Sequence, residues 1–254
     1  MGMKKQSKTI RQVKPRTQGV TMVMDKGLGV HAFTDWAEMV EEYVDFVKLG
    51  FGTARLLKQA HLTKKQVIAK QCQINLYPGG TLFEYYAAQN KVERYFELVI
   101  QWGFSWIEIS DGSYSFSKEQ REKWIKAAKE KGLHVITEIG KKEAGVVIPW
   151  KDCCTQYRRD LDAGADYVII EGRESGMNIG MYDQNGELDH TYVQQIIKQV
   201  GGERMIWEAP LKKQQVALLH LIGQNVNLGN IAPDEALSVE ALRHGLRADT
   251  FGWW

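Results

Sequence analysis

The sequence predicts an α/β protein of the (β/α)8 barrel class, also called the TIM barrel, and three observations support this prediction. Short apolar runs rich in β-branched residues alternate along the chain with longer segments of helical periodicity. Eight such strand–helix units can be traced in 254 residues, which is the usual length of this barrel. Strands that are joined through crossover helices must pair in parallel, so the alternation also predicts a parallel sheet.

Each predicted strand is a short apolar run that ends near a glycine or a charged residue. The first run reads VTMVM and is followed by DKG, a sequence that stops a strand. The eight strands are expected at residues 20–24, 45–49, 73–77, 106–109, 134–139, 167–170, 205–207 and 226–228.

The predicted helices carry apolar residues at helical spacing, and several have a candidate capping residue. They are expected at residues 35–44, 63–71, 83–102 with a break near residue 90, 117–131, 150–163, 189–200, 212–221 and 238–246. Thr34 or Asp35 is the expected N-cap of the first helix and Thr63 that of the second. Ser117 and Gln120 match a capping box, which fixes the start of the fourth helix.

A doubly wound open sheet is the competing architecture. It would place a G-x-G-x-x-G motif after the first strand, whereas residues 25–30 read DKGLGV and hold only G-x-G. No linker, repeat or low-complexity stretch divides the chain, so residues 15–254 are expected to form a single barrel domain. Residues 1–14 are basic and lack the apolar stretch of a secretory signal, and they are expected to form a flexible N-terminal arm.

The composition excludes several classes of function. Thirty-three Lys and Arg residues against 31 Asp and Glu give a net charge of +2, which excludes binding of nucleic acid by bulk charge. No run approaches the roughly 18 apolar residues of a membrane helix. Three cysteines, two of them adjacent, define no disulfide framework. We therefore expect a cytoplasmic protein without nucleic-acid or membrane partners, and the aromatic residues Trp253 and Trp254 leave a homo-oligomer possible.

Four glutamates occur at the ends of successive predicted strands, where a barrel carries its active site. They are Glu108, Glu138, Glu171 and Glu208. A buried carboxylate must be paired, protonated or bound to a cation, and pairing with a nearby Lys or Arg is the alternative for each one. Convergence of four carboxylates on one barrel mouth instead favours a cation with oxygen ligands, Mg²⁺ rather than zinc. Glu138, Glu171 and Glu208 are the first candidate ligands, followed by Glu108.

Basic and small polar residues in the same positions predict an anionic substrate. The expected substrate-binding residues are Lys26, Lys48, Ser110, Arg173, Gly229 and Asn230. Arg suits bidentate contact with an oxyanion, and barrels commonly bind phosphate after their last strands, where residues 229–230 are expected.

Two lysines after the fifth strand are candidate general acids. If Glu138 points into the barrel, strand alternation places Lys142 on the same side and Lys141 on the other. A bulge would reverse this order. Lys142 is therefore the first catalytic candidate and Lys141 the second, and an ion pair between Lys142 and Glu138 is the structural alternative.

Several segments, in order along residues 19–252, resemble the phosphosulfolactate synthase family, which also includes plant heat-stress-associated relatives. They are DFVKLGFGT at 45–53, YPGGTLFE at 77–84, EISDGS at 108–113, TEIGKK at 137–142, GRESG at 172–176 and GLRADTFG at 245–252. The resemblance implies a (β/α)8 barrel, in agreement with the pattern of strands and helices.

The resemblance also implies a lyase that uses Mg²⁺ to add sulfite to phosphoenolpyruvate. The product would be (2R)-phospho-3-sulfolactate, formed through an enolate-like intermediate on a route to sulfolactate or coenzyme M. Lys142 or Lys141 would protonate the carbon next to the carboxylate, and Arg173 with Lys26 or Lys48 would offset the charge of phosphate and sulfite. Two alternatives are kept: a different lyase acting on phosphoenolpyruvate, and a catalytically silent barrel with a stress-protection or interaction role.

Overall fold

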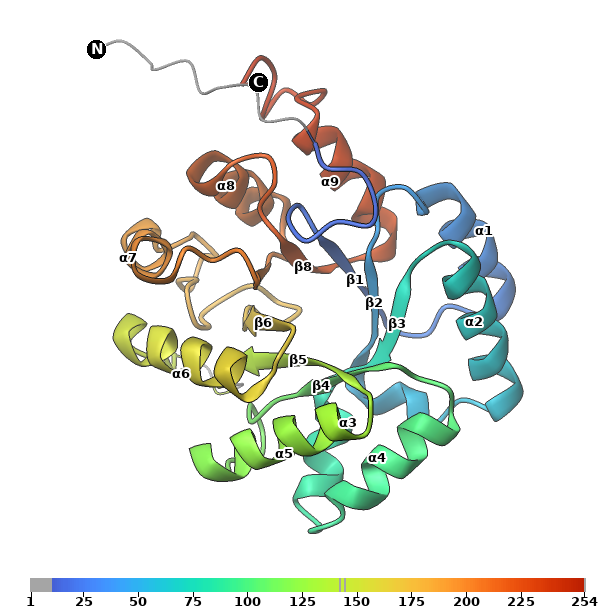
Figure 1. Ribbon diagram of the computed structural model, residues 1–254. Helices are drawn as coiled ribbons and strands as arrows, with labels where there is room; N and C mark the ends of the chain where they lie inside the picture. Colours follow the sequence, from blue (N-terminus) through green and yellow to red (C-terminus); the bar gives the residue numbers. More distant parts are fainter. Residues whose placement is uncertain (1–10, 142, 144, 254) are drawn as a thin grey trace.

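The computed structural model describes residues 11–141, 143 and 145–253, and eight parallel strands form its centre (Figure 1). The strands are β1 (Thr21–Asp25), β2 (Phe46–Leu49), β3 (Asn75–Pro78), β4 (Trp106–Ile109), β5 (His134–Ile139), β6 (Tyr167–Ile170), β7 (Met205–Glu208) and β8 (Leu228–Ile231). They alternate with helices in a nearly closed ring, so the predicted (β/α)8 barrel is confirmed.

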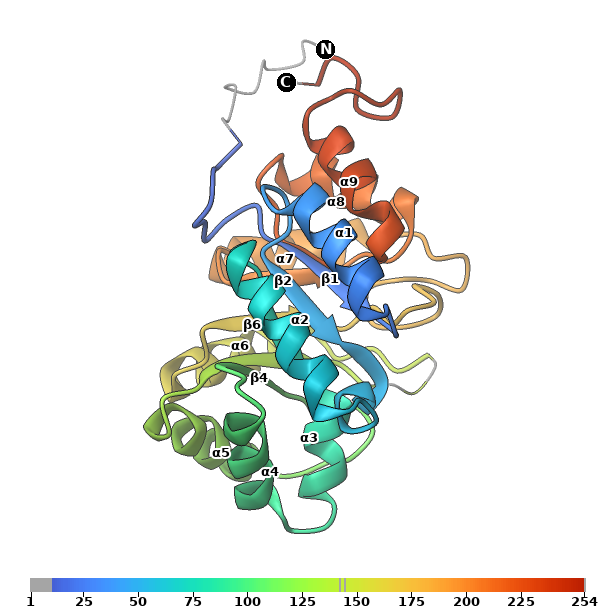
Figure 2. The same ribbon diagram turned by 90° about the vertical axis from the view of Figure 1, so that its right-hand side faces the viewer.

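The helices form an outer layer around the strands (Figures 1 and 2). They are α1 (Val30–Val40), α2 (Gln59–Gln71), α3 (Gly80–Ala87), α4 (Val92–Gln101), α5 (Lys118–Glu130), α6 (Trp150–Ala163), α7 (His190–Val200), α8 (Lys212–Ile222) and α9 (Ala236–Arg243), with short 3-10 helices η1 (Gly50–Arg55) and η2 (Pro233–Glu235). Asn90 has a left-handed φ of 57° and separates α3 from α4, which is the break expected near that position. None of the helices in the described residues is long and apolar enough to cross a membrane.

Two predicted helix starts are wrong. The N-cap of α1 is Gly29 rather than Thr34 or Asp35, and that of α2 is Lys58 rather than Thr63. Neither helix start has a side-chain cap hydrogen bond. The usual preference for Ser, Thr, Asp and Asn at the N-cap therefore does not locate these two helix starts. The capping box that begins α5 is confirmed, with both of its hydrogen bonds present.

The last strand begins two residues later than predicted. Gly229 and Asn230 lie inside β8 rather than in the loop after it. β8 pairs with β1 on one side and β7 on the other, which joins the end of the chain to its beginning.

The sheet has one discontinuity, between β3 and β4. The hydrogen-bonded order of the strands is β3-β2-β1-β8-β7-β6-β5-β4, so in the described residues no backbone ladder joins the two outermost strands. At their carboxyl ends the Gly80 amide, at the start of α3, donates to Glu108 of β4 over 2.7 Å. At their amino ends a cavity of about 800 Å³ lies between α2 and the first residues of both strands.

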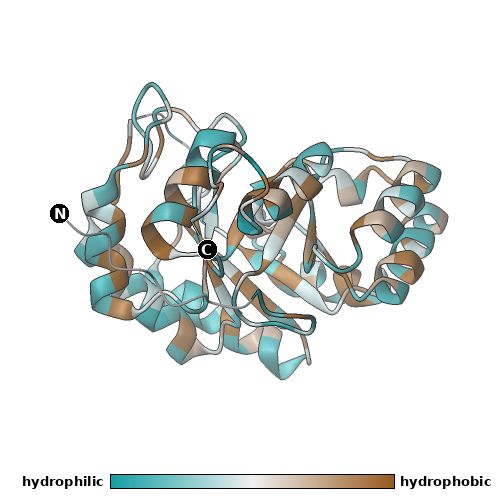
Figure 3. Cartoon of the chain, turned by 90° about the horizontal axis from the view of Figure 1, so that it is seen from above, coloured by the Kyte–Doolittle hydropathy of each residue, from teal (hydrophilic) through white to brown (hydrophobic). Residues whose placement is uncertain are grey.

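The interior of the barrel is apolar near the amino ends of the strands. Phe46 contacts Tyr77, Trp106 and Tyr167 edge-on, with ring centroids 4.9–6.3 Å apart. A second, larger apolar layer separates the strands from the helices, and Figure 3 shows that the helices carry both hydrophobic and hydrophilic segments. The inner layer forms the floor beneath the charged residues at the other end of the barrel.

The end of the N-terminal segment contacts the amino ends of the strands. Arg11 Nε lies 2.8 Å from Glu240 Oε1 of α9, and Lys14 Nζ donates to the carbonyls of Glu41 and Val44. These contacts belong to residues 11–14 of the expected flexible arm, whereas residues 1–10 lie outside the described residues.

Candidate active site

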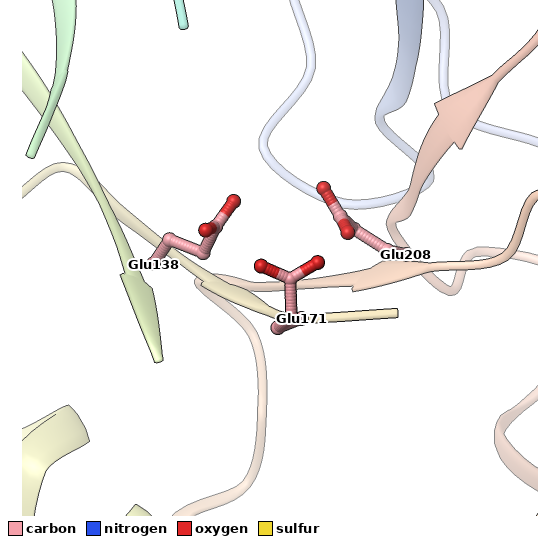
Figure 4. Close-up of side chains that lie close together, drawn as sticks. All are labelled: Glu138, Glu171 and Glu208. Atoms are coloured by element: carbon pink, nitrogen blue, oxygen red, sulfur yellow. The ribbon is translucent and has the colours of Figure 1, made fainter. Parts of the chain in front are cut away.

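The four predicted glutamates meet at the carboxyl ends of β4 to β7, and all are at least 98% buried. Glu108, Glu138 and Glu208 lie within strands, and Glu171 directly follows β6. Figure 4 shows the carboxylates of Glu138, Glu171 and Glu208 turned toward one another. One oxygen from each of these three lies within 4.8 Å of the others. We call these three residues the carboxylate cluster.

The carboxylate cluster could hold a divalent cation with oxygen ligands. Neighbouring ligand oxygens around an octahedral Mg²⁺ are about 3 Å apart, so the three oxygens, which lie within 4.8 Å of one another, would move closer together on a bound ion. The cluster offers neither sulfur nor imidazole nitrogen, which suits Mg²⁺ better than zinc. Glu108 lies outside the cluster, because its Oε1 accepts the Gly80 amide hydrogen bond and its Oε2 faces Lys48.

Lys48 of β2 points into the barrel and contacts three carboxylates at once. Its Nζ lies 3.1 Å from Glu108 Oε2, 3.2 Å from Glu138 Oε2 and 3.1 Å from Glu208 Oε1. Burial alone would lower the pKa of Lys48, but the three glutamates raise it well above its ordinary value. Lys48 is therefore a fixed positive charge. The ion pairing that the sequence offered as the alternative explanation is present for Glu108, Glu138 and Glu208, and a bound cation stays a prediction.

Backbone amides after β6 hold two members of the cluster. Gly172 N donates to Glu208 Oε2 over 2.9 Å, and Arg173 N donates to Glu171 Oε1 over 2.7 Å. A Cβ atom on Gly172 would lie 2.7 Å from the Glu208 carbonyl oxygen, so only glycine permits this approach. Asn230 of β8 adds a 3.3 Å hydrogen bond from Nδ2 to Glu208 Oε2. These hydrogen bonds fix the orientation of both carboxylates.

The two candidate general acids differ in what the structure shows. Lys141 Nζ lies 2.6 Å from Asp111 Oδ2 and 2.7 Å from the Asp111 carbonyl oxygen, so its side chain reaches toward the loop after β4. Lys142 lies outside the described residues.

The remaining predicted substrate residues occupy different surroundings. Lys26 is exposed, with Nζ 5.8 Å from the centre of the Phe51 ring, and Arg173 is half-buried beside Glu171 with a φ of 55°. Ser110 is buried and donates to Glu84.

Gly229 is packed against the barrel interior. A Cβ atom there would lie 2.5 Å from Met22 Cε and 2.8 Å from Ile206 Cγ2. The glycine therefore allows β8 to pack closely on its neighbours.

Sequence reasoning missed a buried charge network beside β5. Arg121 of α5 donates to Asp160 of α6 over 2.7 Å, to the Glu138 carbonyl over 2.9 Å and to Asp111 over 3.2 Å. Asp111 also accepts from Lys141, so one chain of contacts runs from α6 to the loop after β5. Charged residues on the inward face of two predicted helices are the only sequence signal for it.

Two further buried carboxylates shape the loops of the mouth. Glu84 of α3 accepts from Ser110 and from the amides of Ser113 and Tyr114, which orders the loop after β4. Asp25 at the end of β1 accepts from two amides of the following loop and pairs with Lys65 of α2.

A barrel with buried carboxylates and a lysine gathered at the carboxyl ends of its strands is the arrangement typical of an enzyme that acts on small substrates. The chain belongs to the (2R)-phospho-3-sulfolactate synthase (ComA) family, whose profile matches residues 9–249. Phosphosulfolactate synthase of Methanocaldococcus jannaschii is 44% identical over 237 residues, 92% of this chain and 94% of the relative. That of Methanothermobacter thermautotrophicus is 41% identical over 244 residues, 95% of each chain.

Among solved structures, the YdjI aldolase of Escherichia coli K12 superposes with a TM-score of 0.57 over 91% of this chain and 80% of that one. The two sequences are 12% identical, so this similarity concerns the fold alone.

Proposed function

We propose that this chain is a Mg²⁺-dependent lyase that adds sulfite to phosphoenolpyruvate and forms (2R)-phospho-3-sulfolactate. The observation that carries the proposal is the carboxylate cluster, Glu138, Glu171 and Glu208, with three buried oxygens within 4.8 Å in a member of this family. The sulfite sulfur would bond to the methylene carbon of phosphoenolpyruvate. The electrons of the carbon–carbon double bond would move toward the carboxylate, and one proton would then bond to the phosphate-bearing carbon.

The carboxylate cluster would hold Mg²⁺, and a bound Mg²⁺ would offset negative charge on the substrate carboxylate while the enolate-like intermediate exists. The chain prepares this arrangement in advance. The amides of Gly172 and Arg173 orient Glu208 and Glu171, and Lys48 contacts Glu138 and Glu208. Groups held in place before the reaction lower its barrier without reorganising during it.

The proton donor in this proposal is Lys142, with Lys141 as the second candidate. Asp111 binds the Lys141 ammonium at 2.6 Å, which supports a positioning role for Lys141. Lys48 is unsuited to donate a proton, because three glutamates hold its pKa well above the ordinary value.

Arg173 and Lys26 would contact the phosphate and sulfite groups, with Asn230 as a neutral partner. Arg173 stands next to Glu171, and its guanidinium could bind an oxyanion through two parallel hydrogen bonds. Ser110 and Gly229 would act by shaping the site, since Ser110 is bonded to Glu84 and Gly229 is enclosed by Met22 and Ile206. Small anionic substrates and three free cysteines fit a cytoplasmic enzyme that supplies sulfolactate or coenzyme M synthesis.

The test is to incubate the purified chain with phosphoenolpyruvate, sulfite and Mg²⁺ and to follow the phosphorus NMR spectrum. We expect phosphosulfolactate to appear and its formation to stop when EDTA removes the metal. Product formation that EDTA leaves unchanged would contradict the metal assignment. No product with Mg²⁺, Mn²⁺ or Co²⁺ would contradict the reaction itself and would favour the silent barrel. Product with another nucleophile in place of sulfite would favour a different lyase.

A further inference from the structure

We propose that Lys48 is a positioning residue that shares the carboxylate cluster with the divalent cation and weakens the binding of that cation. The inference rests on the proposed metal site and extends it, because it assigns an electrostatic competitor to the same glutamates. It predicts that loss of the lysine charge tightens metal binding in the absence of substrate.

The geometry places the ammonium and the candidate metal ligands in direct contact. Lys48 Nζ is 3.2 Å from Glu138 Oε2 and 3.1 Å from Glu208 Oε1, two of the three members of the cluster. The side chains of all three residues are more than 90% buried, so solvent screens their interaction poorly. A divalent cation bound to the carboxylate cluster would therefore be repelled by the ammonium of Lys48, which contacts two of the same carboxylates.

The same contact has an opposite effect on the shape of the site. Glutamates from β4, β5 and β7 that converge without a cation repel one another, and one or more would turn away. Lys48 removes this repulsion and keeps Glu108, Glu138 and Glu208 together when no metal is bound. Lys48 thus has two effects. It weakens metal binding, and it keeps the glutamates in place before the metal binds.

The substrate completes the charge balance. Phosphoenolpyruvate and sulfite are both anions, and the positive charge of Lys48 at the base of the site favours their arrival. We therefore expect metal and phosphoenolpyruvate to bind cooperatively in the wild type, with weak metal binding alone and tighter binding with substrate.

The experiment compares wild-type protein with Lys48→Met, which removes the charge, and Lys48→Arg, which keeps it. Free Mn²⁺ is measured by electron paramagnetic resonance, and Mg²⁺ binding by calorimetry, both without substrate. We expect Lys48→Met to bind Mn²⁺ about tenfold tighter or more, while Lys48→Arg stays within about threefold of wild type. The KM for phosphoenolpyruvate should rise in Lys48→Met. Lys65→Met, which removes another buried lysine of the barrel, is the matched control and should leave Mn²⁺ affinity unchanged.

Unchanged or weaker metal binding by Lys48→Met, with clear binding by wild type, would overturn the inference and leave the proposed function standing. No binding by either protein would instead overturn the metal site itself. If Lys48→Met does not fold in the absence of metal, millimolar Mg²⁺ should replace the missing positive charge. The far- and near-ultraviolet circular dichroism of the folded protein should then return. Failure of Mg²⁺ to restore folding would also overturn the inference.

Discussion

Gly140 lies against Glu171 so closely that a Cβ atom on Gly140 would be 2.1 Å from the Cβ of Glu171. Gly140 follows β5 and has a φ of 149°, a conformation that residues with side chains rarely adopt. This contact lets the loop after β5 pass beside the end of β6, and so it brings two members of the carboxylate cluster, Glu138 and Glu171, to the same place.

The contact predicts a large cost for Gly140→Ala, with Gly27→Ala as a matched control. Gly27 has nearly the same φ, 146°, but nothing lies within 4 Å of its built Cβ. Both substitutions strain the backbone by about 1 to 3 kcal/mol, and overpacking adds about 1 to 3 kcal/mol at Gly140 only. Urea denaturation should therefore show a larger loss of unfolding free energy for Gly140→Ala. Equal losses would mean that Glu171 moves aside without cost.

The buried network around Arg121 predicts a strong dependence of stability on one side chain. Arg121→Met would leave Asp160 buried without its cation, which costs about 3 to 5 kcal/mol of unfolding free energy. Arg94→Met is the control, because the Arg94–Glu97 pair is more than half exposed and contributes under about 1 kcal/mol. Urea denaturation of both variants measures the difference. A loss below about 1 kcal/mol for Arg121→Met would contradict a structural role for the network.

The buried Cys153 thiol should make the free energy of unfolding fall at alkaline pH. Burial raises the pKa of Cys153 from about 9 to about 12, so the folded protein keeps a proton that the unfolded chain loses. The stabilising contribution is complete below about pH 9 and is lost as pH rises toward 12. Relative to Cys153→Ala, wild-type protein should therefore lose unfolding free energy more steeply as the pH rises above about 9. Parallel pH curves for the two proteins would show that the thiol ionises freely in the fold.

The two lysines after β5 predict a ranked pair of kinetic effects. Lys142→Ala should reduce kcat more than Lys141→Ala, because a missing general acid costs about 100-fold or more, whereas Lys141 is held by Asp111. Asp111→Asn should reproduce the milder Lys141→Ala phenotype. Steady-state kinetics with phosphoenolpyruvate and sulfite measure kcat for each variant. A larger loss of kcat in Lys141→Ala would refute the prediction from strand alternation that Lys142 points into the barrel, and it would favour a bulge after β5.

Much of the fold could be predicted because its signals are local. β4, β5, β6 and α6 have the predicted bounds, since each is a compact apolar or amphipathic run between clear stops. The starts of α1 and α2 could not be predicted, because Gly29 and Lys58 form no side-chain cap. The shift of β8 has a similar cause: Gly229 and Asn230 look like turn residues, and only the close packing on Met22 and Ile206 makes that glycine part of a strand.

The meeting of the glutamates could also be predicted, because parallel strands in a barrel end at one mouth. The contacts among them could not be predicted. Strand alternation does not reveal that Lys48 reaches across the barrel to three glutamates on β4, β5 and β7. Likewise, Arg121 and Asp160 come from two helices whose inward faces are defined only when the helices pack on the sheet.

The most direct test of the account is product formation by Glu171→Gln compared with Glu174→Gln, with Mg²⁺, phosphoenolpyruvate and sulfite. Glu171 is buried in the carboxylate cluster, whereas Glu174 is exposed three residues later. We predict that Glu171→Gln loses about a hundredfold or more in kcat/KM for phosphosulfolactate formation, and that Glu174→Gln keeps the wild-type rate. Wild-type kcat/KM in a folded Glu171→Gln protein would contradict the central claim that the carboxylate cluster carries the reaction.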